Sequence, residues 1–198
     1  MTKSLQGTRT LENLMKAFAG ESQARNRYTF YASIARKEGY RQIEALFIET
    51  ADNEREHAKR FYKHVVENLV AAEPVMVDIQ ADYPAQLGNT LQNLRAAAAG
   101  EHEEHTLLYP EFAKIAEEEG FKAIAVQFRK IADVEVSHEQ RFLKLAANIE
   151  SGKVFKKDEP VRWKCRNCGY IHEGPAAPDM CPACAHPVDH FELMVETY

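Results

Sequence analysis

The chain has 198 residues, of which 45% are apolar and 28% charged, and it carries a formal net charge of −5. This length accommodates one large domain, or a large domain with a small one, and the acidic balance argues against a nucleic-acid-binding protein. Because no stretch approaches the roughly 18 apolar residues of a membrane span, and the N-terminus has no apolar run typical of a signal peptide, we expect a cytoplasmic protein without a membrane partner.

The first 149 residues are expected to form a bundle of four long helices, because apolar residues recur at helical spacing. The predicted helices are Thr10–Lys37, Arg41–Val70, Ala85–Glu119 and Lys122–Asn148. Gly39 and Gly120 are placed to end the first and third helices at tight corners. The segment 71–84 is long enough to cross the bundle, so the second and third helices need not be antiparallel neighbours. Pro110, inside the third helix, predicts a kink or a bulge because it removes a backbone hydrogen bond.

An internal repeat relates the two halves of this helical region, at an offset of 80 or 81 positions. The repeated elements are Ala19-Gly20-Glu21 with Ala99-Gly100-Glu101, Ile34–Tyr40 with Ile115–Phe121, and Glu54-x-x-His57 with Glu135-x-x-His138. Each half therefore supplies a lone glutamate from one helix and a Glu-x-x-His pair from the next. Positions i and i+3 lie on one face of a helix, about 4.5 Å apart in rise, so the two members of each pair point together.

Two helix pairs with these residues predict a two-metal carboxylate site. The predicted ligands are Glu21, Glu54, His57, Glu101, Glu135 and His138. Their mixed oxygen and nitrogen donors fit iron or manganese, and zinc would also bind. The alternative is that each pair lies on a solvated helix face. Apolar residues before both pairs, and the cost of burying four carboxylates without cations, favour the metal site.

Three further residues are candidates for supporting this centre. Glu104 adds a carboxylate on the same face as Glu101, which suggests a ligand that joins or leaves as the metal charge changes. Tyr28 and Tyr109, seven and eight positions after the two lone glutamates, are candidates to hydrogen-bond the ligating carboxylates, although ordinary core aromatics explain them equally well. The remaining histidines of the region are expected on the surface, and they are His64, His102 and His105.

The composition changes after the helical region. Residues 150–161 are polar and charged and are expected to form a linker, and residues 162–198 are expected to form a small second domain. Short β-prone pieces predict strands at Val154–Phe155, Val161–Trp163 and Phe191–Val195. A domain of fewer than about 50 residues has too small a core to fold without a staple, and a bound metal would supply one.

All four cysteines lie in this small domain, in two Cys-x-x-Cys turns formed by Cys165, Cys168, Cys181 and Cys184. In a reducing cytosol such turns indicate a metal site rather than disulfides. Four thiolates make a tetrahedral site for one zinc or one iron. Zinc would only hold the domain together, whereas iron would carry single electrons. A two-metal centre that changes charge needs an electron supply, and this favours iron.

With these motifs the sequence resembles the rubrerythrin family over almost its whole length. Residues 1–149 resemble the ferritin-like di-iron bundles, and residues 162–198 resemble rubredoxin through Cys-x-x-Cys-Gly-Tyr and Cys-Pro-x-Cys. The resemblance implies a mostly α fold, with a four-helix ferritin-like bundle and a small C-terminal β-rich rubredoxin-like domain. It also implies a di-iron centre and one iron on four cysteines. Ala185 stands where free-standing rubredoxins usually carry glycine, and the gap between the two cysteine turns is shorter.

The resemblance further implies a non-haem peroxidase, an oxidoreductase that reduces hydrogen peroxide to water. Electrons would enter through the rubredoxin-like iron, from NAD(P)H through a separate reductase or from a rubredoxin-type donor. The iron ligands implied by the family are Glu21, Glu54, Glu101, Glu135 and His138. His57 and Glu104 would exchange on one iron as it is reduced and oxidised.

The length of the last bundle helix predicts a partner chain. His138 lies about 18 Å along the helix axis from Glu150, at about 1.5 Å per residue, and the linker adds more. Electron transfer over that span within one chain would be slow, so we expect a head-to-tail homodimer. Two other functions stay open, a ferritin-like ferroxidase or iron-binding protein and a purely structural zinc or manganese site. The attached cysteine domain favours the peroxidase, because iron storage needs no electron supply.

Overall fold

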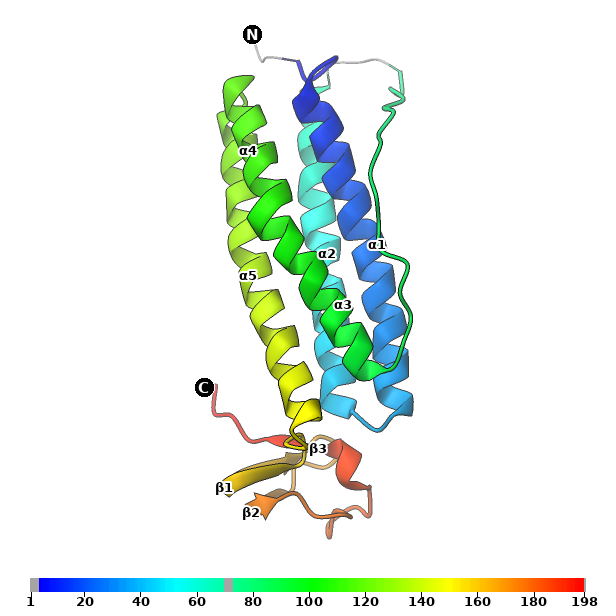
Figure 1. The fold of residues 1–198 in the computed structure, drawn as a ribbon, viewed down its shortest axis with the longest axis vertical. Coiled ribbons are helices and arrows are strands. Elements are labelled where there is room, and N and C mark those ends of the chain that lie inside the picture. Colours follow the sequence, from blue (N-terminus) through cyan, green and yellow to red (C-terminus); the bar gives the residue numbers. More distant parts are fainter. Residues whose placement is uncertain (1–3, 70–72, 198) are drawn as a thin grey trace.

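The structure is a computed structural model that describes residues 4–69 and 73–197, and it has two parts (Figure 1). A bundle of long helices comes first, and a small sheet domain packs against one end of it. The bundle contains α1 (Arg9–Lys37), α2 (Arg41–Asn68), α3 (Thr90–Glu103), a π-helical turn η1 (Glu104–Leu108), α4 (Tyr109–Glu118) and α5 (Lys122–Glu150). The small domain contains β1 (Lys156–Cys165), β2 (Ile171–Ala176), a short 3-10 turn η2 (Val188–His190) and β3 (Phe191–Leu193).

From residue 73 onward, the connection between α2 and α3 runs back along the bundle beside α1, so α2 and α3 point the same way (Figure 1). Two tyrosines fasten it. The hydroxyl of Tyr83 donates to the carbonyl of Lys16 at 3.2 Å, and the hydroxyl of Tyr31 donates to the carbonyl of Gln86 at 2.9 Å. The crossing predicted from the length of this segment is therefore confirmed. As a result α1 packs with α2, and the rod made of α3, η1 and α4 packs with α5.

The corners that join the two members of each helix pair have the same geometry. Gly39 and Gly120 lie in the left-handed region, with φ of 80° and 82°. At both corners the backbone N–H groups of the glycine and of the following aromatic residue donate to carbonyls of the preceding helical turn. These contacts satisfy carbonyls that a helix end would otherwise leave without partners. The sequence repeat therefore corresponds to two equivalent helix hairpins.

Two apolar cores fill the bundle. One is built around the stacked rings of Phe61 and Phe128, whose centroids are 4.9 Å apart. The other is built around Phe47 and Phe142, whose centroids are 5.2 Å apart. Along each of the four rods, a predicted ligand glutamate separates the residues of one core from those of the other. The glutamates therefore form a polar layer between two apolar regions.

The third rod is distorted beside this layer. The backbone N–H of Tyr109 donates to the carbonyl of Glu104, five positions earlier, which is the hydrogen-bond spacing of a π-helix. Pro110 follows directly and has no N–H to offer the carbonyl four positions before it, at Thr106. The distortion predicted at this proline is confirmed, and its form is a π-helical turn.

The small domain is a three-stranded antiparallel sheet in the order β2-β1-β3. Trp163 is fully buried at its centre and donates its indole N–H to the carbonyl of Gly174 at 3.0 Å. The domain contacts the bundle through the stacked rings of Tyr40 and Phe155, whose centroids are 6.2 Å apart. An ion pair between Arg41 and Asp189, 3.5 Å long, lies at the same junction. The domain is thus fastened to the α1–α2 corner as well as to the end of α5.

The predicted fold class is confirmed, but several helix boundaries differ. The third helix begins at Thr90 rather than Ala85, because Asn89 and Gln92 form a capping box that fixes its start. The fourth helix continues to Glu150, two residues beyond the prediction. Val70, the predicted end of the second helix, lies outside the described residues. In the ranges 4–69 and 73–197, none of the helices is both long and apolar enough to cross a membrane.

The strands of the small domain also differ from the prediction. Val154–Phe155 is a bend rather than a strand, because the ring of Phe155 stacks on the bundle. The strand expected at Val161–Trp163 is confirmed as part of β1, which begins earlier, at Lys156, within the predicted linker 150–161. The predicted strand Phe191–Val195 ends at Leu193.

Two glycine substitutions test the role of the corners. Gly39→Ala places a side chain in the left-handed region and should lower the free energy of unfolding by about 1–2 kcal/mol. Gly100→Ala, inside α3, should instead raise it by up to about 1 kcal/mol, because alanine is the better helix former. Denaturant unfolding of the metal-loaded protein measures both changes. Equal effects of the two substitutions would contradict this account of the corner.

Candidate metal centres

Four glutamates meet in the middle of the bundle, one from each rod. Glu21 lies on α1, Glu54 on α2, Glu101 on α3 and Glu135 on α5, and each is at most 1% exposed. Carboxylates are costly to bury in an apolar environment unless protons, hydrogen bonds or cations compensate. The convergence of the four glutamates that the repeat predicts is therefore present in the structure. Their burial requires nearby groups or ions that offset the negative charge.

The glutamates and two histidines form two overlapping clusters of four residues. Glu54 and Glu135 belong to both clusters; Glu21 and His57 complete one, and Glu101 and His138 complete the other. Within each cluster the candidate ligand atoms lie within 4.8 Å of one another. Each cluster thus has one carboxylate and one imidazole of its own, and shares two carboxylates with the other. This is the donor arrangement that two cations with bridging carboxylates require.

The shared carboxylates point one oxygen toward each histidine. For Glu54, Oε2 lies 3.0 Å from Nδ1 of His57 and Oε1 lies 3.2 Å from Nδ1 of His138. For Glu135, Oε1 lies 2.9 Å from Nδ1 of His57 and Oε2 lies 2.7 Å from Nδ1 of His138. Both carboxylates are therefore oriented to bridge between the two clusters.

Two buried tyrosines orient the unshared carboxylates. The hydroxyl of Tyr28 donates to Oε1 of Glu101, and the hydroxyl of Tyr109 donates to Oε1 of Glu21, both at 2.5 Å. Each tyrosine crosses from one half of the repeat to a glutamate of the other half. Both hydroxyls therefore contact ligand candidates, in the supporting role considered for them from the sequence.

The carboxylate oxygens and imidazole nitrogens that the tyrosine hydrogen bonds do not use are those that a pair of metal ions needs. Among the described residues, eight buried polar atoms of this centre make no hydrogen bond of good geometry, although several lie within ion-pair distance of one another. They are both carboxylate oxygens of Glu54 and Glu135, Oε2 of Glu21 and Glu101, and Nδ1 of His57 and His138. Buried polar atoms are almost always paired in folded proteins, so the gathering of these atoms in two overlapping clusters fits a site for two cations. The donor set of oxygen and imidazole nitrogen fits iron.

The pKa values of the buried glutamates and histidines also indicate that this centre needs positive charge. Burial, together with the charge of Glu54, raises the pKa of Glu101 to about 8. Burial alone would lower the pKa of His138, but the surrounding carboxylates outweigh it and raise that pKa to about 12. The same competition raises the pKa of His57 to about 9. Because metal ligands must be deprotonated, cations entering this centre would displace protons from these groups.

Glu104 lies beside the two clusters and belongs to neither. It is partly buried on η1, and its pKa is raised well above the ordinary value by burial and by the charges of nearby carboxylates, including Glu101. It faces a cavity of about 710 Å³ between α1, α3 and the α2–α3 connection. Arg27 and Tyr83 line the same cavity and were not identified from the sequence, since only the folded connection brings Tyr83 over this surface.

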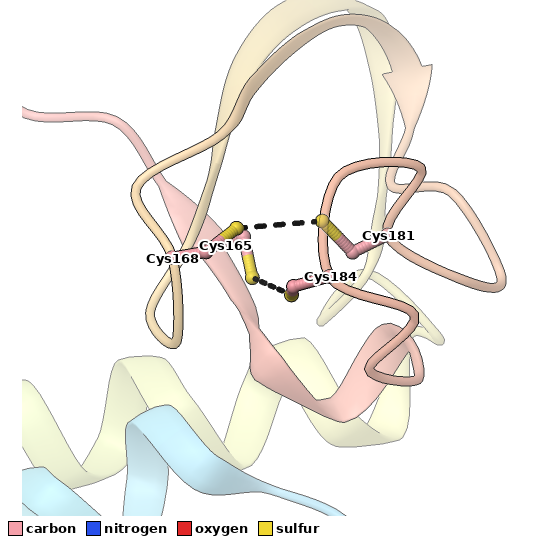
Figure 2. A group of neighbouring side chains, drawn as sticks. All are labelled: Cys165, Cys168, Cys181 and Cys184. Atoms are coloured by element: carbon pink, nitrogen blue, oxygen red, sulfur yellow. Dashed lines mark hydrogen bonds between the residues drawn. The ribbon is translucent and has the colours of Figure 1, made fainter.

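The four cysteines form a second, separate cluster in the small domain (Figure 2). The sulfurs of Cys165 and Cys184 are 3.8 Å apart, and those of Cys168 and Cys181 are 3.7 Å apart. A disulfide would require about 2.05 Å. Four thiolates bound at about 2.3 Å around a tetrahedral ion lie about 3.8 Å from one another, so the observed spacing fits one metal ion. The backbone N–H of His186 lowers the pKa of Cys184 to about 6, which favours the thiolate that a metal needs.

Left-handed residues shape both cysteine turns. Gly169 follows the first turn with φ of 80°, and Ala185 follows the second with φ of 54°. The residue singled out in the sequence as a departure from rubredoxins thus adopts a conformation that usually favours glycine. The fold of the turn is kept, and the backbone N–H of Ala185 donates to the carbonyl of Cys181.

The remaining histidines of the bundle differ from one another in exposure, although all three were expected on the surface. His64 is buried on α2, so its predicted surface position is wrong; it lies one helical turn from the Phe61 core, on the inward face. His102 is exposed as predicted, and His105 is only partly exposed. Both of these contact Glu139 of α5.

Comparisons with known proteins agree with this arrangement. The family model described as Rubrerythrin matches residues 12–146, and the one described as Rubrerythrin, rubredoxin-like domain matches residues 163–192. Rubrerythrin of Clostridium perfringens is 59% identical over 99% of this chain and 100% of its own length. Rubrerythrin of Nitratidesulfovibrio vulgaris is 53% identical over 97% of each chain.

Solved structures give the same picture of the fold. A mixed-valence state of nigerythrin matches with a TM-score of 0.61 and 32% identity, over 98% of this chain and 92% of that one. A bacterioferritin of Desulfovibrio desulfuricans matches with a TM-score of 0.64, over 73% of this chain and 82% of that one. At 21% identity this second likeness concerns the bundle fold alone.

Removing one tyrosine hydroxyl tests the support given to the carboxylate layer. Tyr28→Phe frees Oε1 of Glu101 and should weaken metal binding to the bundle by about 10-fold or more. Tyr31→Phe is the matched control, because Tyr31 packs against Tyr28 but donates to the carbonyl of Gln86 instead. Competition with a chelator measures both affinities. An equal loss in the two variants would show that the effect comes from general packing.

Proposed function

Because the chain belongs to the rubrerythrin family, we propose that it is a non-haem peroxidase that reduces hydrogen peroxide to water. The family consists of oxidoreductases with a di-iron site in the bundle and one iron on the four cysteines of the rubredoxin-like domain. The observation that carries the proposal is the pairing of the two-cation donor set with a cysteine cluster in one chain. A storage site for iron would have no use for an attached single-electron carrier.

The reaction consumes two electrons and two protons for each peroxide, and it yields two water molecules. When bound, the two irons supply the electrons. The ligand candidates for them are Glu21, Glu54, Glu101, Glu135, His57 and His138. The cavity beside Glu104 offers peroxide a route to this layer, and the carboxyl of Glu104, whose pKa is raised by burial and by the neighbouring carboxylates, is placed to exchange protons with a molecule in the cavity.

We further propose that His57 and Glu104 exchange as ligands of one iron. Nδ1 of His57 points into the cluster that His57 forms with Glu21, Glu54 and Glu135, whereas Glu104 lies at the edge of the cavity next to Gly20. Its Oε1 is 3.9 Å from the position that a Cβ on Gly20 would occupy, which is an ordinary contact distance, so Glu104 lies directly beside α1. An imidazole suits the lower charge of a ferrous ion, and a carboxylate suits the higher charge of a ferric ion.

Electrons would reach the bundle from the cysteine cluster of a second chain. Within one chain the small domain packs at the end of the bundle, and His138 precedes the end of α5 by about 18 Å at about 1.5 Å per residue. A head-to-tail homodimer would shorten this path, and NAD(P)H would supply the electrons through a separate reductase or a rubredoxin-type donor. A protein that stays monomeric in solution scattering while keeping full turnover would contradict the dimer.

Rapid mixing of the anaerobically reduced protein tests the function. Oxidation much faster with hydrogen peroxide than with dioxygen is expected of a peroxidase. A preference for dioxygen, with accumulation of ferric mineral, would instead favour the ferritin-like ferroxidase. Cys181→Ser should remove the iron of the small domain and stop steady turnover, but it should leave the single-turnover oxidation of the bundle iron intact.

Glu104→Ala tests the ligand exchange. The variant should fold and bind metal, because Glu104 lies outside both four-residue clusters, yet its peroxide turnover should fall by about 10-fold or more. Glu111→Ala, on the exposed surface of α4, is the control and should keep the rate of the parent protein. Unchanged turnover in the Glu104 variant would refute the exchange.

A further inference from the structure

A third group of metal-binding side chains lies on the outside of the bundle. His102 on α3, His105 on η1 and Glu139 on α5 each offer one ligand atom, and these atoms lie within 4.8 Å of one another. His102 and Glu139 directly follow Glu101 and His138 in the chain. Successive residues of a helix point about 100° apart, and all three side chains are partly or largely exposed, so this group lies on the outer surface and outside the carboxylate layer.

The three side chains converge on one point from two neighbouring rods. Nδ1 of His102 is 3.0 Å from Oε1 of Glu139, and Nε2 of His105 is 2.6 Å from Oε2 of the same carboxylate. The two imidazole rings are 5.2 Å apart and nearly perpendicular, at 80°. Ligand atoms bound at about 2.05 Å around a tetrahedral ion lie about 3.3 Å from one another, so small side-chain rotations would close this group around a cation.

We propose that His102, His105 and Glu139 form a third metal site, which binds one divalent transition-metal cation on the outer face of the bundle. Two imidazoles and one carboxylate suit zinc and ferrous iron rather than calcium or magnesium, which prefer oxygen ligands. The three residues leave coordination positions for water. The side chain of His102 is 59% exposed, whereas those of His105 and Glu139 are 14% and 18% exposed. Two of the ligands are thus largely packed against the bundle, and the exposed His102 leaves the site accessible to cations from solvent.

A simple ion pair explains this group less well. Exposed ion pairs contribute little stability, and one pair needs only one imidazole for each carboxylate. Here both oxygens of one carboxylate are each occupied by a separate ring. The π-helical turn contributes His105 to the outer face while it directs Glu104 toward the cavity, so one distortion serves both sides of the rod.

Zinc titration of the iron-loaded protein tests the proposal. Calorimetry should detect one zinc ion bound per chain in addition to the resident iron, with the iron content unchanged. Crystals soaked in zinc chloride should show an anomalous peak between the three side chains. His102→Ala and Glu139→Gln should each weaken this zinc binding by about 10-fold or more.

Two control variants separate this site from other zinc-binding surfaces. His172→Ala, in β2, and Glu111→Gln, on α4, change the same residue types elsewhere and should leave the affinity unchanged. The proposal is overturned if no anomalous peak lies between His102, His105 and Glu139. It is also overturned if zinc binds with the same affinity to the His102→Ala and Glu139→Gln variants.

Discussion

The structure depends on the burial of four carboxylates between two apolar cores. Each rod carries its glutamate at the boundary between the core around Phe61 and Phe128 and the core around Phe47 and Phe142. Apolar packing on both sides excludes water, and this makes the uncompensated charge expensive. The carboxylate layer therefore requires cations. The apolar packing that makes burial of the carboxylates unfavourable also holds their oxygen atoms, and the nitrogen atoms of the histidines, in fixed positions.

The two tyrosines show how the cores and the layer are joined. Tyr109 belongs to one core and Tyr28 to the other, and each hydroxyl reaches a glutamate contributed by the opposite half of the repeat. Neither half of the repeat can complete its own carboxylate support. The bundle and the metal centre are therefore one cooperative unit, in which local packing and ligand orientation cannot be separated.

Much of this could be predicted from the sequence, because the repeat placed six ligand candidates at helical spacing. The fold class and the cofactors agree with the comparisons, and the roles of individual site residues stay predictions. The predicted boundaries of the strands and helices were wrong where specific contacts determine them. Phe155 stacks on Tyr40 and does not join the sheet, and a capping box fixes the start of the third helix at Thr90. His102 and His105 were assigned only to the surface, because their partner Glu139 comes from another helix. No local spacing rule connects residues across two rods.

The π-helical turn has a counterpart in the repeat itself. The offset between the halves is 80 at Glu101 and 81 at Tyr109, so the second half holds one additional residue between these two positions. That residue is accommodated in η1, and the position aligned with Glu104 in the first half is Ala24. This one-residue difference makes the two halves of the centre unequal. The two four-residue clusters have matching donors, but among the described residues the second half alone adds a carboxyl group at this position, Glu104, which faces an open cavity.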